Sequence, residues 1–409
     1  MLNGLYPDAS FDQCIKCNAC VVDCPVSNVS LEFGGPKHLG PELKRLVENN
    51  EYIDDSRIDY CTMCGNCDIA CPENVSVFTL NAYSKARHIE LNGSNFRDYI
   101  LSNAEKVGKL ASAFAPITNW AMRTKWIRKI MEGVMKIPVE RRFPEYHFKN
   151  FRRIYDKKAS NTERKVAYFV GCSAMYNEPH VAEAFVKVME KNGIEVAVPD
   201  QKCCGIPIFA NGRMEQGLKN AEYNVKSFLE YTRKGYDVVL TCTSCTTALK
   251  KEYVHFLKTK EASELAEHVY DADEYLRMLH ENGELNTNFG EVNVKAGYYT
   301  PCHMKTQGIG NPAVDVLSLI PGYEINTIHA DCCGQCGTYG FKKEKYDISM
   351  AMGKSMAEAI EEEGCEHTVT ECGMCTNQIL QLTDQKVYHP MEILAEAYEK
   401  AEAKEPVHV

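Results

Sequence analysis

The sequence has few of the features that take a protein into a membrane or bind a nucleotide. No apolar run reaches the ~20 residues that a membrane-spanning helix needs, and the N-terminus has neither the basic region nor the apolar stretch of a secretory signal. Walker loops, nucleophile elbows and H-E-x-x-H motifs do not occur. Residues 308–313 match a dinucleotide fingerprint only loosely, since Pro312 interrupts them. We therefore expect a cytoplasmic chain that does not oxidise a metabolite by itself.

Basic residues are too few for a general nucleic-acid-binding protein, because 46 Lys and Arg stand against 56 Asp and Glu. Apolar residues make up 44% of the 409 residues and charged residues 25%, as is ordinary for a folded protein. At roughly 150 residues per domain, this length predicts two or three domains. The unusual number is that of the cysteines, 20. In a reducing compartment, cysteines at short regular spacings are metal ligands or redox groups more often than disulfides.

Two runs near the N-terminus share the pattern C-x2-C-x2-C-x3-C-P, the spacing of bacterial ferredoxins with two [4Fe-4S] clusters. In such ferredoxins the first three cysteines of a run hold one cubane cluster, and the fourth ligates the cluster of the other run. The predicted ligands are Cys14, Cys17, Cys20 and Cys71 for one cluster, and Cys61, Cys64, Cys67 and Cys24 for the other. A pair of structural zinc sites is the alternative, although zinc usually takes paired C-x2-C units. The long segment between the runs resembles the helical ferredoxin domain of the succinate dehydrogenase iron–sulfur subunit.

From about residue 165 the chain repeats itself. The first copy contains Cys172, Cys203, Cys204, Cys242 and Cys245, and the second contains Cys302, Cys332, Cys333, Cys372 and Cys375. Matching cysteines lie 129 or 130 residues apart, and a glycine follows the adjacent pair in both copies. Such self-similarity indicates two copies of one structural unit.

The cysteines of each copy follow short apolar runs that alternate with helical stretches. These runs are KVAYFVG, IEVAV and DVVLT in the first copy, and VKAGYY, YEINTI and HTVT in the second. The alternation predicts a parallel sheet with right-handed crossovers. Ligands of such sheets gather beyond the carboxyl ends of the strands. We therefore expect all five cysteines of a copy at one edge of its sheet.

This constellation of five cysteines resembles the CCG domain of heterodisulfide reductase catalytic subunits. The resemblance implies a noncubane [4Fe-4S] cluster in each copy, and a structural zinc on four of the five thiolates is the alternative. Two cysteines are left over. Cys336 lies three residues beyond Cys333 and so within reach of that site, but we expect it, like Cys365, to be a small buried apolar side chain. His303, next to Cys302, either tunes a sulfur or makes a structural polar contact.

A basic segment joins the two halves. Residues 105–158 carry fourteen Lys and Arg against five Asp and Glu, and they include both tryptophans, Trp120 and Trp126. Between Trp126 and Met135 the apolar residues recur at helical spacing, with Arg128 off that face. A basic amphipathic helix with tryptophan suits an anionic bilayer surface, which makes Trp120, Trp126 and Arg128 candidates for contact with membrane or quinone. A helix that packs on its own domain, or on an acidic partner subunit, would show the same pattern.

Short stretches between the cysteines resemble the family of anaerobic glycerol-3-phosphate dehydrogenase C subunits. They are residues 35–37 (GPK), 40–41 (GP), 114–117 (FAPI), 151–153 (FRR), 300–304 (TPCHM) and 338–344 (TYGFKKE). The resemblance implies a complex with flavin-containing subunits A and B, peripheral to the cytoplasmic side of the inner membrane. Electrons from sn-glycerol 3-phosphate would pass through two cubane and two noncubane clusters to a membrane quinone, menaquinone, in anaerobic respiration.

Other functions fit the same cysteines. They are direct disulfide reduction, as in heterodisulfide reductase, electron transfer that serves lactate or glycolate oxidation, and a zinc scaffold without redox activity. For the fold we expect an α+β multi-domain chain. It would have a mostly helical two-cluster ferredoxin domain over residues 1–100, a basic helical connector over 101–160, and two α/β CCG domains with parallel sheets over 161–286 and 287–409.

Overall fold

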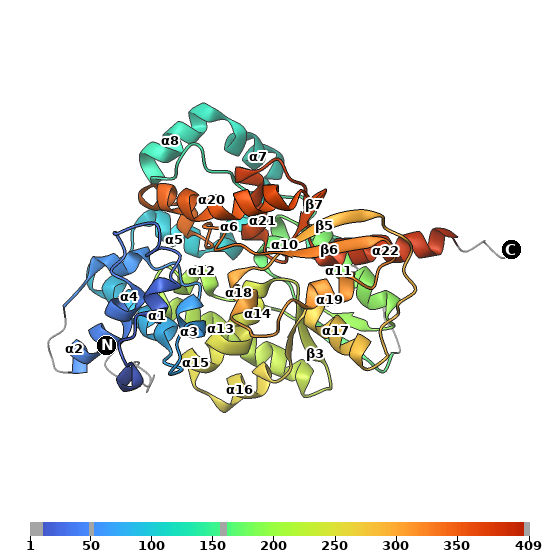
Figure 1. Ribbon diagram of the computed structural model, residues 1–409, viewed down its shortest axis with the longest axis horizontal. Helices are drawn as coiled ribbons and strands as arrows, with labels where there is room; N and C mark the ends of the chain where they lie inside the picture. Colours follow the sequence, from blue (N-terminus) through green and yellow to red (C-terminus); the bar gives the residue numbers. More distant parts are fainter. Residues whose placement is uncertain (1–10, 49–52, 156–161, 405–409) are drawn as a thin grey trace.

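The computed structural model describes residues 11–48, 53–155 and 162–404 (Figure 1). Two parallel sheets of four strands each have equivalent strand orders, β2-β1-β3-β4 and β6-β5-β7-β8. The strands are β1 Lys165–Phe169, β2 Glu195–Ala197, β3 Asp237–Leu240, β4 Val269–Asp271, β5 Val294–Tyr299, β6 Tyr323–Ile328, β7 His367–Val369 and β8 Val387–Tyr388. The predicted class, a helical N-terminal part followed by two repeated parallel sheets, is confirmed. The N-terminal residues 1–10, on which the prediction of no secretory signal rests, lie outside the described residues.

The central strands form where the sequence has unbroken apolar runs. In β1, Val166 to Phe169 are all buried and pair in parallel with Asp237 to Leu240 of β3. The equivalent pair in the second sheet is β5 with β7. A parallel sheet is covered on both faces, so residues that point either way must be apolar.

Helices cover both sheets. Those of the first copy are α10 Cys172–Tyr176, α11 Pro179–Lys191, α12 Ile206–Phe209, α13 Met214–Thr232, α14 Thr243–Thr247, η4 Ala248–Glu252, α15 Tyr253–Leu257, α16 Lys260–Ala266 and α17 Ala272–Glu281. Those of the second copy are α18 Cys302–Lys305, α19 Pro312–Leu317, η5 Tyr339–Phe341, η6 Lys343–Lys345, α20 Tyr346–Glu363, α21 Gly373–Leu382 and α22 Pro390–Lys404.

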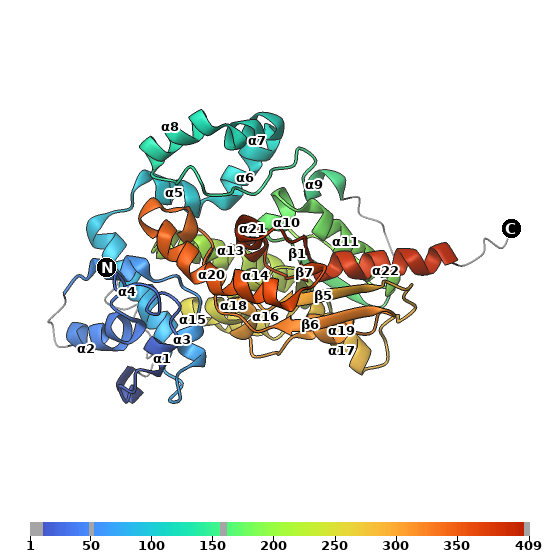
Figure 2. The ribbon, with the colours of Figure 1, turned by 45° about the horizontal axis from the view of Figure 1, so that its top comes forward.

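The two copies pack on each other with approximate two-fold symmetry. Helix α11 packs on α22, and α17 packs on α19 (Figures 1 and 2). Because α11 and α19 each follow the first strand of their copy, and α17 and α22 the last, the two contacts are equivalent. A single apolar core runs through this interface, with Phe185, Leu276, Val316 and Leu394 among its members. The two cysteine-bearing edges are thereby held in a fixed relation.

In the described residues of the N-terminal segment, the regular elements are all helices, and the segment lies against both copies. Its elements are η1 Phe11–Gln13, α1 Ala19–Val22, η2 His38–Glu42, α2 Leu43–Glu48, η3 Ser56–Tyr60, α3 Asn66–Ile69 and α4 Val77–Asn92. Tyr83 of α4 packs with Phe209 and Phe256 of the first copy. Phe33 packs with Tyr339 and Met352 of the second copy.

The basic segment folds as a layer of short helices, α5 Phe96–Ser102, α6 Ala104–Ala113, α7 Ala115–Arg123, α8 Lys125–Met135 and α9 Phe151–Ile154. Helices α7 and α8 form an outer edge of the molecule, above α20 and α21 (Figure 1). Trp120 and Trp126 are 58% and 60% exposed, whereas Arg128 is only 3% exposed. The Arg128 guanidinium donates hydrogen bonds to the carbonyl oxygens of Pro138 and Arg141. The returning chain covers that side of the helix, so Arg128 does not share the exposed surface of Trp120 and Trp126, and its contact with membrane or quinone stays a prediction.

Candidate metal centres

The eight N-terminal cysteines line two separate cavities. One is lined by Cys14, Cys17, Cys20 and Cys71, and we call it the outer site. The other is lined by Cys24, Cys61, Cys64 and Cys67, and we call it the inner site. The structure thus brings the cysteines together in the crossed sets of the sequence analysis, in which the fourth cysteine of each run joins the first three of the other.

The backbone of the two runs is the same at matching positions. Lys16 and Asn18 have positive φ angles of 61° and 69°, and Met63 and Gly65 have φ angles of 58° and 82°. Left-handed residues at such positions turn successive backbone N–H groups toward one side, which suits an anionic group. The Val75 N–H, for example, donates to Cys71 Sγ at 3.3 Å.

Burial opposes the ionisation of the cysteines at both sites. Burial raises the pKa of Cys64 and of Cys67 well above that of an ordinary cysteine. At the outer site, burial raises the pKa of Cys20 to about 11. Cationic iron that binds these sulfurs would favour the thiolate form. Four cysteines that line one cavity, with a buried lysine, Lys85, beside Cys61 of the inner site, fit a [4Fe-4S] cluster.

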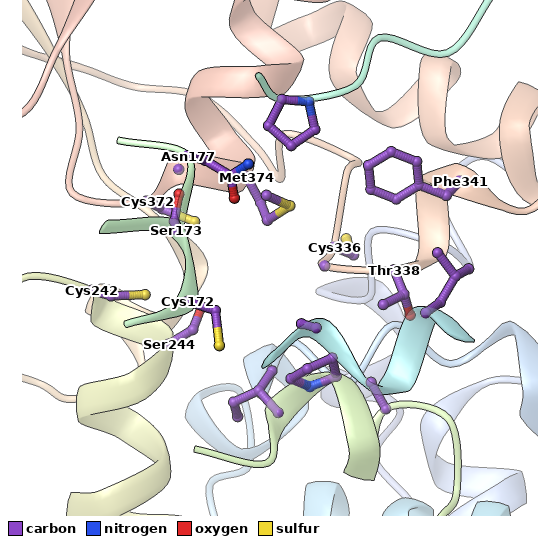
Figure 3. A pocket seen from close by; sticks show the side chains of 18 of the residues that line it. Cys172, Ser173, Asn177, Cys242, Ser244, Cys336, Thr338, Phe341, Cys372 and Met374 are labelled. Carbon is purple, nitrogen blue, oxygen red and sulfur yellow. The ribbon is translucent and has the colours of Figure 1, made fainter. Parts of the chain in front are cut away.

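The ten cysteines of the two repeats face one common cavity of about 460 Å³, which we call the central cavity (Figure 3). Cys172 begins α10 directly after β1, and Cys242 precedes α14 directly after β3. Their counterparts in the second copy occupy the same places after β5 and β7. The cysteines therefore lie beyond the carboxyl ends of the strands, as the sequence predicts, and both sets line the same cavity.

The internal geometry of the two sets is equivalent. Cys204 Sγ lies 3.3 Å from Cys245 Sγ, and Cys333 Sγ lies 3.4 Å from Cys375 Sγ. The glycine after each adjacent pair has a positive φ angle, 99° at Gly205 and 81° at Gly334, and a Cβ atom at Gly334 would lie 2.1 Å from a backbone oxygen. Both the backbone conformation and the lack of space therefore require glycine at this position.

Within each set the sulfurs lie close to one another, as Cys204 and Cys245 do in the first repeat. Within the ranges that the structure describes, no group of three or more His, Cys, Asp or Glu side chains is placed to hold a single metal ion. Each set has five thiols, one more than the four ligands that a zinc ion takes, and a cluster of several irons presents more coordination positions.

The two remaining cysteines differ from each other. Cys336 lines the central cavity, and its Sγ lies 3.4 Å from Cys332 Sγ. Our expectation of a buried apolar side chain is wrong for Cys336, because the positive φ angle of 45° at this residue sends the loop back toward the site. Cys365 is 6% exposed and does not line the cavity, and the expectation is confirmed there.

The inner site adjoins the central cavity. Thr62, Met63 and Cys64 line both spaces. His303 Nδ1 lies 2.7 Å from Ser244 Oγ, and His303 Nε2 lies 3.4 Å from the Met63 carbonyl oxygen. His303 therefore makes a structural polar contact that joins both repeats to the N-terminal segment, at the place where the inner site adjoins the central cavity.

The basic segment sends a charged side chain of opposite sign to each repeat, which the sequence analysis missed. Glu105 Oε2 accepts a hydrogen bond from the Cys203 N–H at 3.0 Å. Arg141 is 1% exposed and donates to Gln335 Oε1 at 2.7 Å and Gln378 Oε1 at 2.5 Å. Among the described residues, Arg141 has no carboxylate partner. Nothing in a segment with so many basic residues distinguishes Arg141 from the rest.

Comparison with known proteins agrees with these sites. A 4Fe-4S dicluster domain matches residues 10–75, and a cysteine-rich domain, CCG, matches residues 166–250 and 296–380. The chain is 36% identical to the C subunit of the anaerobic glycerol-3-phosphate dehydrogenase of Escherichia coli K12, over 95% of this chain and 99% of that protein. The chain belongs to the family of these C subunits. All twenty cysteines lie within the matched segments.

More distant relatives share the same organisation. The glycolate oxidase iron–sulfur subunit of Escherichia coli K12 is 23% identical over 97% of this chain and 96% of its own length. The D subunit of the dihydromethanophenazine:CoB–CoM heterodisulfide reductase of Methanosarcina barkeri is 24% identical over 94% of this chain and 93% of its own length. The chain is thus an iron–sulfur subunit of the oxidoreductase type. In the described part of the chain, no helix has the length and apolarity needed to cross a bilayer.

Proposed function

We propose that this chain carries electrons from a flavin-containing glycerol-3-phosphate dehydrogenase, made of subunits A and B, to a membrane quinone, with menaquinone as the natural acceptor. The observation that supports this most is that the cysteine-lined inner site adjoins the cysteine-lined central cavity. The inner site shares Thr62, Met63 and Cys64 with the central cavity, so an electron at one site has a neighbouring site to pass to.

Each site would hold its own cluster. The outer site, Cys14, Cys17, Cys20 and Cys71, and the inner site, Cys24, Cys61, Cys64 and Cys67, would each hold a cubane [4Fe-4S] cluster. The five cysteines of each repeat would hold a noncubane [4Fe-4S] cluster. Such clusters accept and release single electrons, and their potentials depend on burial and on hydrogen bonds to the sulfurs. Five thiols in each repeat, against the four ligands that zinc takes, support clusters rather than the zinc alternative.

The outer site and the basic segment suit different partners. At the outer site Cys17 is exposed, which suits electron entry from the flavin subunits. At the basic segment, Trp126, Ile130 and Val134 form an exposed apolar row on α8, and Lys125 and Lys129 lie exposed beside it. This surface suits peripheral contact with the cytoplasmic face of an anionic inner membrane in anaerobic respiration.

Cluster content tests the proposal directly. We expect the chain, purified without oxygen, to contain about sixteen irons, four for each [4Fe-4S] cluster, with matching sulfide and no zinc. About eight irons with two zincs would contradict noncubane clusters in the repeats and leave the two cubanes. Co-purification of a flavin-containing glycerol-3-phosphate dehydrogenase subunit would support the proposed donor. A lactate or glycolate dehydrogenase in its place would change the donor but not the transfer role.

Disulfide reduction is the second candidate function. Two sets of five cysteines that line one cavity, together with the heterodisulfide reductase relative, favour it. A heterodisulfide reductase should turn over a heterodisulfide with reduced viologen as the electron donor. We expect no such turnover here, and a quinone analogue in the same assay should be reduced.

A further inference from the structure

The central cavity has a second wall that carries no cysteine. Every residue that the basic segment contributes to the cavity lies between positions 100 and 146, on α5 to α8 and the chain that follows. These residues are Ile100, Leu101, Ala104, Val107, Gly108, Ala111, Thr118, Met122, Met131, Met135, Ile137, Phe143, Pro144 and Tyr146. We call them the apolar wall. Clusters would be held by the cysteines, and because the apolar wall offers them no ligand, it is left to another molecule.

The lining excludes charged ligands. Among the described residues, no Lys, Arg, Asp or Glu lines the central cavity. Several of the polar side chains that line it already have partners: Ser173 donates a hydrogen bond to Glu178, and Ser244 is hydrogen-bonded to His303. A phosphate or carboxylate group would lose its hydration here without any compensating charge. A neutral, largely apolar ring with few polar atoms would lose little hydration on entering this cavity.

The apolar wall is also the inner side of an exposed apolar surface. On α8, Met131 and Met135 line the cavity, whereas Ile130 and Val134 are exposed. On α6, Ala111 faces the cavity and Leu110 is 66% exposed. A single layer of helices therefore separates the cavity from the surface that we propose to contact the membrane. Both the cavity and the exposed surface on the two sides of this layer are apolar. A ligand with an apolar tail would therefore suit both sides.

We propose that the apolar wall binds the ring of a quinone, between the basic segment and the two cysteine sets, with the isoprenoid tail directed out past α6 to α8. This inference rests on the proposed function and names the place where its acceptor binds. The quinone would take two electrons, one at a time, from the reduced clusters and two protons from solvent, and would leave as quinol. The electrons come from the dehydrogenase, so the balance needs no further reductant.

Two neighbouring positions on α6 allow a matched test. Ala111→Phe adds a ring to the apolar wall, and Leu110→Phe places the same side chain on the outside of the same helix. Val107→Phe is a second filling variant at a half-buried position, for the case that Ala111→Phe does not fold. Iron content and thermal unfolding would show that each variant is intact. The probe is a short-chain naphthoquinone, and the measurement is equilibrium dialysis against the oxidised holoprotein without oxygen.

We expect the wild type and Leu110→Phe to bind one equivalent with equal affinity, and Ala111→Phe or Val107→Phe to weaken binding at least tenfold. Absence of saturable binding by the wild type, or equal binding by an intact filling variant, would overturn the inference. A second measurement, oxidation of the reduced clusters by the same quinone, separates the inference from the proposed function. Oxidation that is equally fast in the filling variants would place the reaction elsewhere and leave the proposed function standing. Binding at the wall without oxidation would contradict the proposed function and leave the site standing.

Discussion

The Arg141 guanidinium and the Gln335 side-chain oxygen lie 2.7 Å apart, two residues beyond the cysteine pair of the second repeat. In the first repeat the corresponding pair is approached by an acid instead, because Glu105 accepts a hydrogen bond from the Cys203 backbone N–H. A buried cation favours the reduced, more negative form of a nearby cluster, and an anion disfavours it. The two repeats therefore offer equivalent ligands in opposite electrostatic surroundings.

We expect Arg141→Gln to lower the reduction potential of the cluster in the second repeat, and Glu105→Gln to raise that of the cluster in the first. The effect should be on the order of 1 kcal/mol at an effective dielectric constant near 20, or tens of millivolts for one electron. Redox titration followed by EPR would measure both. Lys109→Gln, which removes the exposed partner of Glu105, is the control and should change the two reduction potentials little. Equal shifts of one sign in both variants would contradict this interpretation.

Crossed ligation at the N-terminal sites has a distinct signature. Cys24 belongs to the first run but lies in the inner site with the cysteines of the second run. Cys24→Ser should therefore disturb the inner cluster, which adjoins the central cavity, and Cys71→Ser the outer one. Each variant should lose up to about four irons, and EPR should show which signal is lost. Cys365→Ser, at a buried cysteine outside every site, should keep the full iron content. Loss of the outer signal in Cys24→Ser would contradict the crossed arrangement.

Cys336 gives the second repeat a spare thiol where the first repeat has Pro207. Its Sγ lies 3.4 Å from that of Cys332. We expect Cys332→Ala to retain more iron than the matched variant Cys203→Ala, because Cys336 can replace the lost ligand. The double variant Cys332→Ala/Cys336→Ala should lose as much iron as Cys203→Ala. Iron and sulfide analysis of the three proteins decides the matter, and identical losses in both single variants would show that Cys336 is no substitute.

The exposed tryptophans should control binding to lipid. Trp120→Ser/Trp126→Ser should weaken co-sedimentation with anionic vesicles by about tenfold or more, because burial of the two rings contributes on the order of 2 kcal/mol. Binding of the wild type should also weaken as salt screens the lysines of α8. Tyr223→Ser, at an exposed aromatic residue of α13, is the matched control. Equal pelleting of all three proteins would count against membrane contact through α7 and α8.

Glu252 makes the stability of the first repeat depend on pH. Burial raises the pKa of its carboxyl group from 4.5 to about 8. The folded state therefore keeps a proton that the unfolded chain loses, and stability is complete below about pH 4.5 and falls as pH rises toward 8. Glu252→Gln should remove this loss and stabilise the protein at pH 8 by a few kcal/mol. Urea unfolding at pH 6 and pH 8 would measure the free energy of unfolding of both proteins. Glu215→Gln, at an exposed position, is the control and should leave the free energy of unfolding unchanged at both pH values.

The features that the sequence predicted are those encoded by neighbouring residues. A run such as KVAYFVG is read as a buried strand without knowledge of its partners, and the strand places Cys172 at its end. Arg128 is a residue whose burial could not be predicted from the sequence. Helical spacing separates an apolar face from a polar one, but it does not reveal that residues 137–143 return to cover the polar side. The same holds for Arg141 and Glu105, whose positions depend on how the basic segment crosses the two repeats. The meeting of both cysteine sets at one cavity likewise follows from the packing of α11 on α22 and α17 on α19.

Two-fold symmetry alone would make the two repeats equivalent. Two equivalent repeats would give electron transfer between them no preferred direction. The N-terminal segment removes this equivalence, because Cys64 meets the central cavity beside Cys302 and Cys336 of the second repeat. The inner site thus lies nearer to the cysteines of the second repeat. In the proposed electron transfer, this asymmetry would give two otherwise equivalent repeats an entry side and an exit side.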